Sequence, residues 1–264
     1  MIMNEKIDGG LRMNNMFDLT GKVAIVTGAA MGLGQGMATA LAKAGADIVS
    51  VGLGDNTETQ ALIEGAGRKF LAVDANLMGI EVIPAVIEKV VAAFGKIDIL
   101  VNCAGTIRRA DAIDFTEKDW DDVMDLNLKT VFFFSQAAAK QFIKQGHGGK
   151  IINIASMLSF QGGIRVPSYT GSKSGVMGVT RLMANEWAKY NINANAIAPG
   201  YMATANTAPI RADEKRNAEI VDRIPAGRWG MPEDLAGPVV FLAAAASDYV
   251  NGYTVAVDGG WLAR

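Results

Sequence analysis

The chain has little of what several classes of protein require. It contains one cysteine, Cys103, which cannot form an internal disulfide, and one histidine, His147, which excludes a histidine-based triad or the usual zinc clusters. No apolar run approaches the roughly 18 residues that span a bilayer. The net charge of -2 argues against a nucleic-acid surface. We therefore expect a cytoplasmic protein with no metal, no nucleic-acid partner and no membrane partner.

The first residues also lack features that would give them a role. Residues 1–16 have neither a basic start nor an apolar centre, so they do not form a secretory signal. We expect a disordered extension there, followed by one domain over residues 17–264. No Pro/Ser-rich linker, charge block or repeat interrupts that stretch.

Short apolar runs alternate with longer amphipathic segments along the domain. The sequence predicts strands near 22–27, 46–51, 69–73, 97–102, 150–154, 192–197 and 253–257. It predicts helices near 33–44, 57–65, 80–94, 117–145, 167–190 and 232–245. This alternation indicates an α/β fold of the Rossmann type, with a doubly wound parallel seven-stranded sheet and helices on both faces. Its ligand crevice should lie beyond the carboxyl ends of the strands.

Tyr169 and Lys173 stand four residues apart in a predicted helix, with Ser156 upstream after an apolar run. Such a step places phenol and ammonium on one helix face. A cation about 4 Å away, at an effective dielectric of about 20, favours the phenolate by up to about 4 kcal/mol, or roughly three pK units. Tyr169 could then act as a general acid or base near neutral pH. Alone, the pair is equally compatible with an ordinary helix.

The segment Thr27-Gly28-Ala-Ala-Met-Gly32-Leu-Gly34 joins a predicted strand to a helix of small residues. Glycines in such a turn allow a tight bend and a close approach of the backbone to a pyrophosphate. The N–H groups and the positive end of the helix dipole would face the phosphates. This glycine turn, with Ser156, Tyr169 and Lys173 downstream, predicts a dinucleotide-binding enzyme.

Further motifs follow the other strands: Asp74, Asn102-Cys-Ala-Gly105, Asn127, Pro199-Gly-Tyr-Met-Ala-Thr204 and the closing Asn251–Gly260. Taken together, these residues resemble the short-chain dehydrogenase/reductase family from about residue 17 onward. The resemblance implies hydride transfer between a nicotinamide dinucleotide and an alcohol or ketone. It implies the catalytic residues Asn127, Ser156, Tyr169 and Lys173. It implies a cofactor site formed by Gly28, Ala30, Met31, Gly32, Leu33, Gly34, Asp74, Asn102, Ala104, Gly105, Tyr169, Lys173, Pro199, Gly200, Met202 and Thr204.

The chemistry assigns a role to each catalytic residue. Ser156 can hold the substrate oxygen, Tyr169 can transfer the proton, and Lys173 can lower the pKa of the tyrosine. The resemblance adds that Lys173 binds the nicotinamide ribose and that Asn127 holds a water linking Lys173 to solvent. Taken alone, Asn127 would be read as a buried helix residue bonded to backbone. Cys103 stands where the family usually has asparagine, and we interpret it as a packing residue.

Cofactor preference depends on the end of the second predicted strand. Gly52 stands where relatives that prefer NAD often carry aspartate, and no arginine or lysine stands there or beside Met31. The absence of a basic residue for a 2′-phosphate favours NAD, with NADP as the alternative. Asp55 is a candidate for the missing carboxylate.

Longer stretches, at 151–169, 181–189 and 258–264, resemble family members that act on 2-keto-3-deoxy-D-gluconate in bacterial uronate breakdown. The resemblance implies a small-molecule keto sugar acid as substrate. Candidate substrate residues are Ser156, Tyr169, Arg109, Gln161 and Arg165, of which Arg165 is favoured for the carboxylate because it lies between Ser156 and Tyr169. Alternatives are another sugar acid such as 2-deoxygluconate, a 3-oxoacyl substrate, or a dinucleotide-sensing regulator without catalysis.

Two further segments carry expectations. Residues 204–224 form a candidate lid, and the charged run Arg211–Arg216 within it should be a solvated helix face. The glycines Gly171, Gly175 and Gly178 lie roughly opposite the Tyr169 face, which predicts close approach by another helix. With the apolar residues of helices 117–145 and 167–190, this stripe predicts one twofold interface. The C-terminal strand 253–257 and the tail 261–264 offer a second surface, and the two interfaces together predict a homotetramer.

Overall fold

The computed structural model describes residues 16–264, so the extension predicted for residues 1–16 lies outside them except for Met16. Within this range seven strands form one parallel sheet in the order β3-β2-β1-β4-β5-β6-β7. The strands are β1 (Val23–Thr27), β2 (Asp47–Gly52), β3 (Phe70–Asp74), β4 (Ile99–Asn102), β5 (Gly149–Ile154), β6 (Ile192–Pro199) and β7 (Thr254–Val257). The predicted doubly wound sheet is confirmed.

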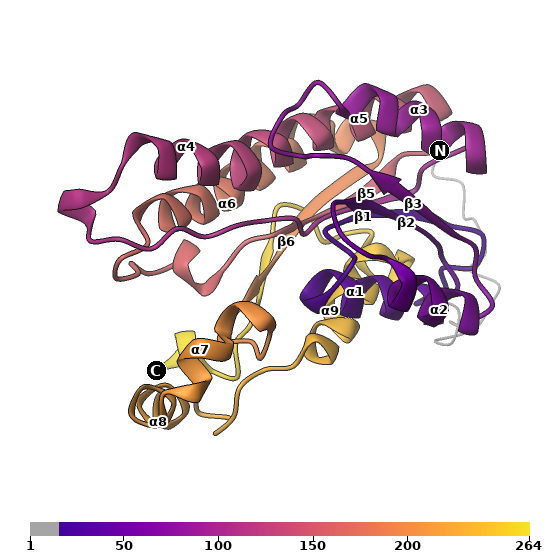
Figure 1. Ribbon diagram of the computed structural model, residues 1–264. Coiled ribbons are helices and arrows are strands. Elements are labelled where there is room, and N and C mark those ends of the chain that lie inside the picture. The colour runs from indigo at the N-terminus through magenta and orange to yellow at the C-terminus, as the bar shows by residue number, and fades with distance from the viewer. Residues whose placement is uncertain (1–15) are drawn as a thin grey trace, which may run out of the picture.

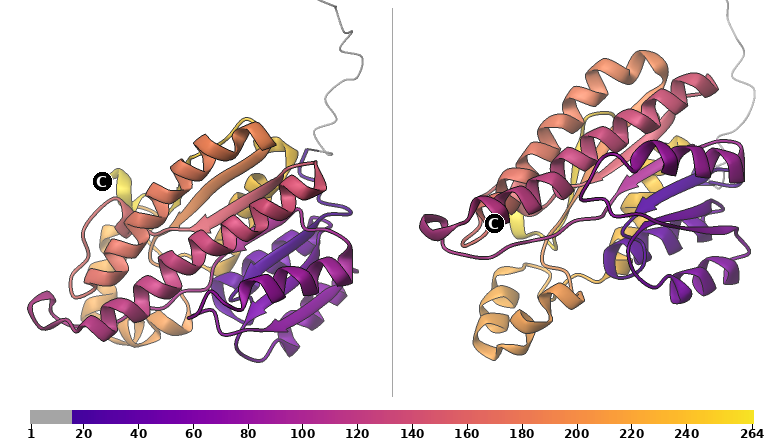
Figure 2. Two further views of the ribbon diagram at one scale, coloured as in Figure 1. Left: turned by 90° about the horizontal axis from the view of Figure 1, so that it is seen from above. Right: turned by 45° about the horizontal axis from the view of Figure 1, so that its top comes forward.

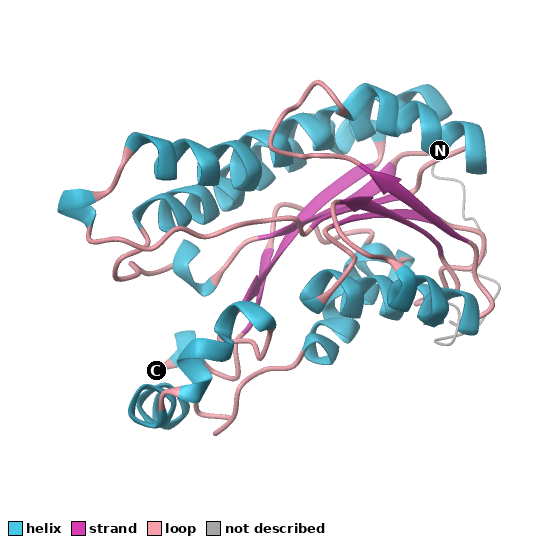
Figure 3. Ribbon diagram, in the orientation of Figure 1, coloured by secondary structure: helices cyan, strands magenta, loops and turns pink. Residues whose placement is uncertain are grey.

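Helices cover both faces of this sheet (Figures 1 and 3). One face carries α3 (Ile83–Phe94), α5 (Thr130–Gln145) and α6 (Pro167–Trp187), and α5 and α6 run side by side (Figure 2). The other face carries α1 (Gly32–Lys43), α2 (Thr57–Gly65) and α9 (Ala236–Ala243). Inner strands such as β1 and β6 are buried from both sides, which is why they read as continuous apolar runs and not as alternating patterns.

Two hydrophobic clusters fill the space between the sheet and its helices. Leu41 of α1 and Val239 of α9 belong to one cluster. Phe134 of α5 and Met183 of α6 belong to the other. Each is fully buried, at 0 % exposure, so each face of the sheet has its own close-packed layer that fixes the strand ends.

The helix predicted over residues 117–145 is broken. It consists of α4 (Glu117–Met124), a π-helical turn (Asp125–Lys129) and α5. Thr116 caps α4, since its side chain accepts a hydrogen bond from the backbone N–H of Asp119. A π-turn adds a residue to the helical ladder and is frequent at functional sites. Here it contains Asn127.

Two helices that the strand–helix layout lacked stand apart from the sheet (Figure 1). They are α7 (Ala208–Ala212) and α8 (Glu214–Arg223). We call residues 204–224 the lid segment. Its residues Ile220 and Ile224 pack with Met157 and Trp261 in a small cluster of their own. No helix among residues 16–264 has the length and apolar character needed to cross a bilayer.

Candidate active site

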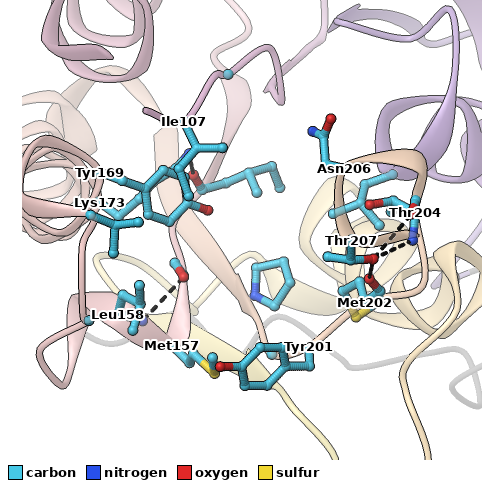
Figure 4. Close-up of a pocket in the computed structure, with 18 of the residues that line it drawn as sticks. Ile107, Met157, Leu158, Tyr169, Lys173, Tyr201, Met202, Thr204, Asn206 and Thr207 are labelled. Carbon is cyan, nitrogen blue, oxygen red and sulfur yellow. Dashed lines mark hydrogen bonds between the residues drawn. The ribbon is translucent and has the colours of Figure 1, made fainter. Parts of the chain in front are cut away.

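The carboxyl ends of β1, β4, β5 and β6 border a cleft of about 820 Å³, which is a usual size for a ligand site. Figure 4 shows Tyr169, Lys173 and Leu158 on one side of it, with Met202, Thr204 and Thr207 across from them. The cleft brings together most of the predicted site residues: Gly28, Met31, Gly32, Leu33, Gly34, Ala104, Gly105, Arg109, Ser156, Gln161, Tyr169, Lys173, Pro199, Gly200, Met202 and Thr204.

The glycine turn makes the tight bend that the sequence predicts. Gly28 and Gly32 have φ values of +68° and +59°, in the region that favours glycine. A Cβ on Gly34 would overlap the carbonyl oxygen of Gly28, so a larger residue cannot fit there. Helix α1 then begins without a side-chain cap at Met31 and without an acidic residue in its first turn. Its first N–H groups and positive dipole end therefore suit a phosphate group.

The loop after β4 is tied to the glycine turn. The hydroxyl oxygen of Thr27 accepts hydrogen bonds from the backbone N–H groups of Cys103 and Ala104, each at 2.9 Å. Burial raises the pKa of the Cys103 thiol to about 11, so it stays a neutral, weakly polar side chain at pH 7. This geometry agrees with a packing role for Cys103.

Three groups meet on the wall formed by β5 and α6. Lys173 Nζ lies 5.7 Å from the ring centroid of Tyr169, one helical turn away. It donates a hydrogen bond of 2.6 Å to the carbonyl oxygen of Ile154, at the end of β5. The Ser156 hydroxyl accepts a bond of 3.2 Å from the backbone N–H of Leu158. It also hydrogen-bonds the Tyr169 phenol, which lowers the pKa of the tyrosine.

The net pKa of Tyr169 nevertheless moves in the opposite direction from the sequence expectation. Burial raises it above its ordinary value, and this outweighs the lowering by Ser156 and by the charge of Arg109. Lys173 is itself buried, and desolvation lowers its pKa to about 8. The sequence predicted that the charge of Lys173 would set the pKa of the Tyr169 phenol, but burial has the larger effect.

Asn127 lies behind the cleft wall with no exposed surface. Its Oδ1 accepts a hydrogen bond of 2.8 Å from the backbone N–H of Thr106, and its Nδ2 donates one of 2.9 Å to the Thr106 carbonyl. A Cβ built on Gly105 would stand 3.2 Å from Asn127 Oδ1 and 3.8 Å from Lys173 Nζ. The amide thus holds the loop that runs past Lys173. This agrees with the alternative that Asn127 is a buried helix residue hydrogen-bonded to backbone.

Several predicted residues lie outside the cleft lining. Asn102 is buried beneath it, where its Nδ2 donates to Ser135 Oγ and Asn153 Oδ1. Asp74 is exposed at the end of β3. Ala30 also lies outside the lining, and its carbonyl accepts a hydrogen bond from the hydroxyl of Thr59.

The favoured carboxylate ligand, Arg165, is also elsewhere. Its Nε forms an ion pair of 2.9 Å with Asp111, and its φ of +63° turns the backbone at a loop. The position of Arg165 between Ser156 and Tyr169 in the sequence therefore did not predict where its side chain points, because Asp111 on another loop binds the guanidinium. Arg109 does line the cleft, whereas Arg108 pairs with Asp119 and Asp122.

The lid segment, a candidate from the sequence, does line the cleft, whereas the contributions of Arg223 and of residue 261 were missed. Arg216 and Arg223 of α8 line the cleft together with Trp261. Arg216, expected on a solvated face, forms an ion pair of 3.0 Å with Glu219. The charges of α8 were visible in the sequence, but the contact of this helix with Met157 and Trp261 depends on tertiary packing.

Two residues near the end of β2 bear on cofactor preference. Gly52 has a φ of +149°, and a Cβ there would meet the backbone of Gly28 at 3.5 Å. Asp55, the candidate carboxylate, accepts hydrogen bonds from the N–H and hydroxyl of Thr57 at 2.9 and 2.6 Å. Its carboxylate is therefore engaged by Thr57, the first residue of α2, and Asp55 does not line the cleft.

The part of the chain that the structure describes contains no group of three or more His, Cys, Asp or Glu side chains arranged to hold a metal ion. The polar groups of the cleft are hydroxyls, cations and backbone N–H groups, together with the amides of Gln161 and Asn206 and the carboxylate of Glu219. Such a set suits anionic and hydroxylated ligands.

Comparison with known proteins identifies the class. Residues 28–262 match the family described as Enoyl-(Acyl carrier protein) reductase, and this chain belongs to the short-chain dehydrogenase/reductase family. The 2-dehydro-3-deoxy-D-gluconate 5-dehydrogenase of Escherichia coli K12 is 72% identical over 94% of this chain and 98% of its own length. The enzyme of the same name from Bacillus subtilis 168 is 53% identical, over 96% of this chain and 99% of its own.

A solved structure from Agrobacterium tumefaciens superposes with a TM-score of 0.89 at 54% identity, covering 95% of this chain and 100% of that one. It is provisionally assigned as a 2-deoxy-D-gluconate 3-dehydrogenase and contains bound NADP. These similarities confirm the family and the fold that the sequence motifs predicted.

Proposed function

We propose that this chain is a nicotinamide-dependent oxidoreductase that interconverts 2-keto-3-deoxy-D-gluconate and 2,5-diketo-3-deoxygluconate. The observation that carries the proposal is the meeting of Ser156, Tyr169 and Lys173 in one cleft with the glycine turn. The 72% identity to an enzyme named for 5-dehydrogenation of this sugar acid supports the substrate.

The protein residues divide the work of the reaction. Ser156 holds the substrate oxygen by a hydrogen bond. Tyr169 accepts the proton of the hydroxyl in oxidation and donates a proton to the carbonyl oxygen in reduction. Lys173 places a positive charge beside the phenol, and the amide of Asn127 fixes the neighbouring loop. When bound, a nicotinamide dinucleotide accepts or supplies the hydride.

The glycine turn and the start of α1 would hold the pyrophosphate of that cofactor. A Cβ on Gly28 would crowd the backbone of Ala104 and one on Gly34 would overlap the Gly28 carbonyl, so only glycine keeps this turn and its backbone N–H groups in place. Lys173 would bind the nicotinamide ribose. We propose NAD as the preferred form, because no basic residue stands at Gly52 or beside Met31. The bound NADP of the Agrobacterium relative supports measurable use of NADP as well.

A second substrate candidate is another sugar acid such as 2-deoxygluconate, which the assignment of the Agrobacterium relative favours. A 3-oxoacyl substrate and a regulator without catalysis complete the alternatives. The regulator is disfavoured because Ser156, Tyr169 and Lys173 all stand in the cleft.

Steady-state assays with 2-keto-3-deoxygluconate, 2-deoxygluconate, gluconate and a 3-oxoacyl thioester, each with both dinucleotides, test the proposal. We expect the highest kcat/KM with 2-keto-3-deoxygluconate and NAD. Faster turnover of any other substrate would assign the chain to that substrate, and no turnover with dinucleotide binding retained would support the regulator.

We also propose a homotetramer in the cytoplasm. Trp120 on α4 and Leu182 on α6 are 42% and 44% exposed, which supports burial of this face by a second copy. The packing of Gly175 differs from the expectation, however. A Cβ there would meet Leu128 of the same chain at 2.8 Å, whereas one on Gly178 would meet nothing within 4 Å. Only the Gly178 end of the stripe is therefore open to a neighbouring helix.

A further inference from the structure

Arg223 of α8 stands on a wall of the cleft that connects directly to the catalytic serine. Met157, the neighbour of Ser156, packs with Ile220, Ile224 and Trp261. Ile220 and Ile224 are three residues before and one residue after Arg223 on the chain. The cluster thus fixes the part of α8 that carries Arg223 beside the Ser156 loop.

The side chain of Arg223 is held by an aromatic platform. Its guanidinium carbon lies 4.0 Å from the ring centroid of Trp261, which is 5% exposed. Stacking fixes the plane of a guanidinium but leaves the N–H donors at its edge for a ligand. Within residues 16–264 Trp261 has no acceptor for its buried indole N–H. The contact with Arg223 is made by the ring face of Trp261 and not by this N–H.

The other cations of the cleft interact with protein groups. Lys173 donates to the Ile154 carbonyl, and Arg216 pairs with Glu219. Arg109 also lines the cleft, where its charge lowers the pKa of Tyr169. Arg223 forms no ion pair and no side-chain hydrogen bond with any residue that the structure describes.

The proposed substrate needs a cation away from the reacting carbon. Four carbon–carbon bonds, each of about 1.5 Å, separate its carboxyl carbon from C5. With C5 at Ser156 and Tyr169, the carboxylate lies up to about 6 Å from the reacting carbon. The wall that contains Met157, the neighbour of Ser156, carries Arg223 stacked on Trp261, and this cation is available to the carboxylate.

We infer that Arg223 binds the substrate carboxylate and that Trp261 is the residue that positions it. This inference rests on the proposed function and names the specificity-determining contact of the same site. It replaces Arg165, which is paired with Asp111. Arg223 selects acids from neutral sugars by a charge-assisted, potentially bidentate hydrogen bond.

The test compares the sugar acid with its methyl ester, which keeps the carbon chain and lacks the charge. Arg223→Met should raise KM for the acid about 10- to 100-fold, the loss of one charged hydrogen bond. It should leave kcat within about threefold and leave the dinucleotide Kd and the ester KM unchanged. Lys215→Met is the matched control, because Lys215 is an exposed cation of the same helix outside the cleft lining. It should change none of these values.

Variants of Trp261 test the positioning role. Trp261→Phe keeps a ring for Arg223 and should change KM for the acid less than threefold. Trp261→Leu removes the ring and should raise it by a large part of the Arg223→Met effect. Equal losses for acid and ester in Arg223→Met, or an unchanged KM for the acid, would overturn the inference.

Failure of the proposed function can be told apart from failure of this inference. If wild-type protein does not oxidise 2-keto-3-deoxygluconate, the substrate assignment fails. Calorimetry with gluconate as the carboxylate probe, in the presence of dinucleotide, then decides the role of Arg223. At least tenfold weaker binding to Arg223→Met supports the carboxylate site, and equal binding in both proteins refutes it.

Discussion

Burial governs the chemistry of single residues in this cleft. It raises the pKa of the Tyr169 phenol and lowers the pKa of the Lys173 ammonium to about 8. Both shifts have one origin, since a low-dielectric wall disfavours any charged form. At pH 7 the tyrosine is therefore a protonated donor beside a cationic lysine, which suits the reduction of a ketone.

Replacing Tyr169 with phenylalanine removes the one phenol that the mechanism uses. We expect Tyr169→Phe to lower kcat at least about a thousandfold, because general acid–base catalysis contributes roughly 10²–10⁴. The dinucleotide Kd should change less than about threefold, since the ring remains. Stopped-flow turnover with fluorescence titration of the dinucleotide measures both. Retention of more than a tenth of wild-type kcat would remove Tyr169 from the mechanism.

The Lys173 pKa of about 8 predicts a pH dependence. The lysine is charged below this pH and loses its charge as the pH rises through it. Without the cation the phenol becomes a weaker acid, so kcat/KM for ketone reduction should fall above about pH 8. Profiles from pH 6 to 10 would show the break, and Lys173→Met should lack it. The same break in both proteins would assign it to another group.

Gly52 offers a test of cofactor preference. Gly52→Asp places a carboxylate where a 2′-phosphate would be repelled, so kcat/KM with NADP should fall at least about tenfold relative to NAD. The backbone φ of +149° at this position disfavours any side chain. The variant should therefore also unfold at a lower temperature, which differential scanning calorimetry measures. An unchanged NAD to NADP ratio would place the 2′ position elsewhere.

Among the elements, the glycine turn with α1 is the most tightly specified. A Cβ at Gly34 would overlap the carbonyl of Gly28, so Gly34→Ala must displace the turn. We expect its dinucleotide Kd to rise at least about tenfold, a loss comparable to one charge-assisted hydrogen bond. Gly237→Ala, in α9 with nothing within 4 Å of a new Cβ, is the matched control and should bind normally. Normal binding by Gly34→Ala would show that the turn adapts.

Elements defined by local pattern were predictable, and elements defined by tertiary contacts were not. The apolar runs of the strands and the Gly28–Gly34 turn each carry their signal within a few residues. The π-turn at Asp125–Lys129 does not, because its residues suit an ordinary helix and its cause is the packing of Asn127 against Thr106. Arg165 and Trp261 were misread or missed for the same reason, since their partners lie far along the chain.

On the scale of the whole molecule, the assembly can be tested through Gly178. A Cβ there would have nothing of its own chain within 4 Å, so we expect Gly178→Leu to fold and yet to block approach by a neighbouring helix. We expect light scattering to show a tetramer for the wild type and a smaller species for this variant. Gly65→Leu, an equally open glycine at the end of α2 on the other face of the sheet, is the control. Equal masses for all three proteins would place the interface elsewhere.

The order of the strands has a consequence for how the chain reaches this structure. The inner strand β1 pairs in parallel with β2 and with β4, where Ala24 lies beside Ile99, and every other pairing is also parallel. No pair can therefore form as a local hairpin, and each must close a long loop first. Refolding should be slow for a chain of this size, with helical circular dichroism recovering before enzymatic activity. The recovery of activity would then measure when the inner strands have paired and completed the cleft.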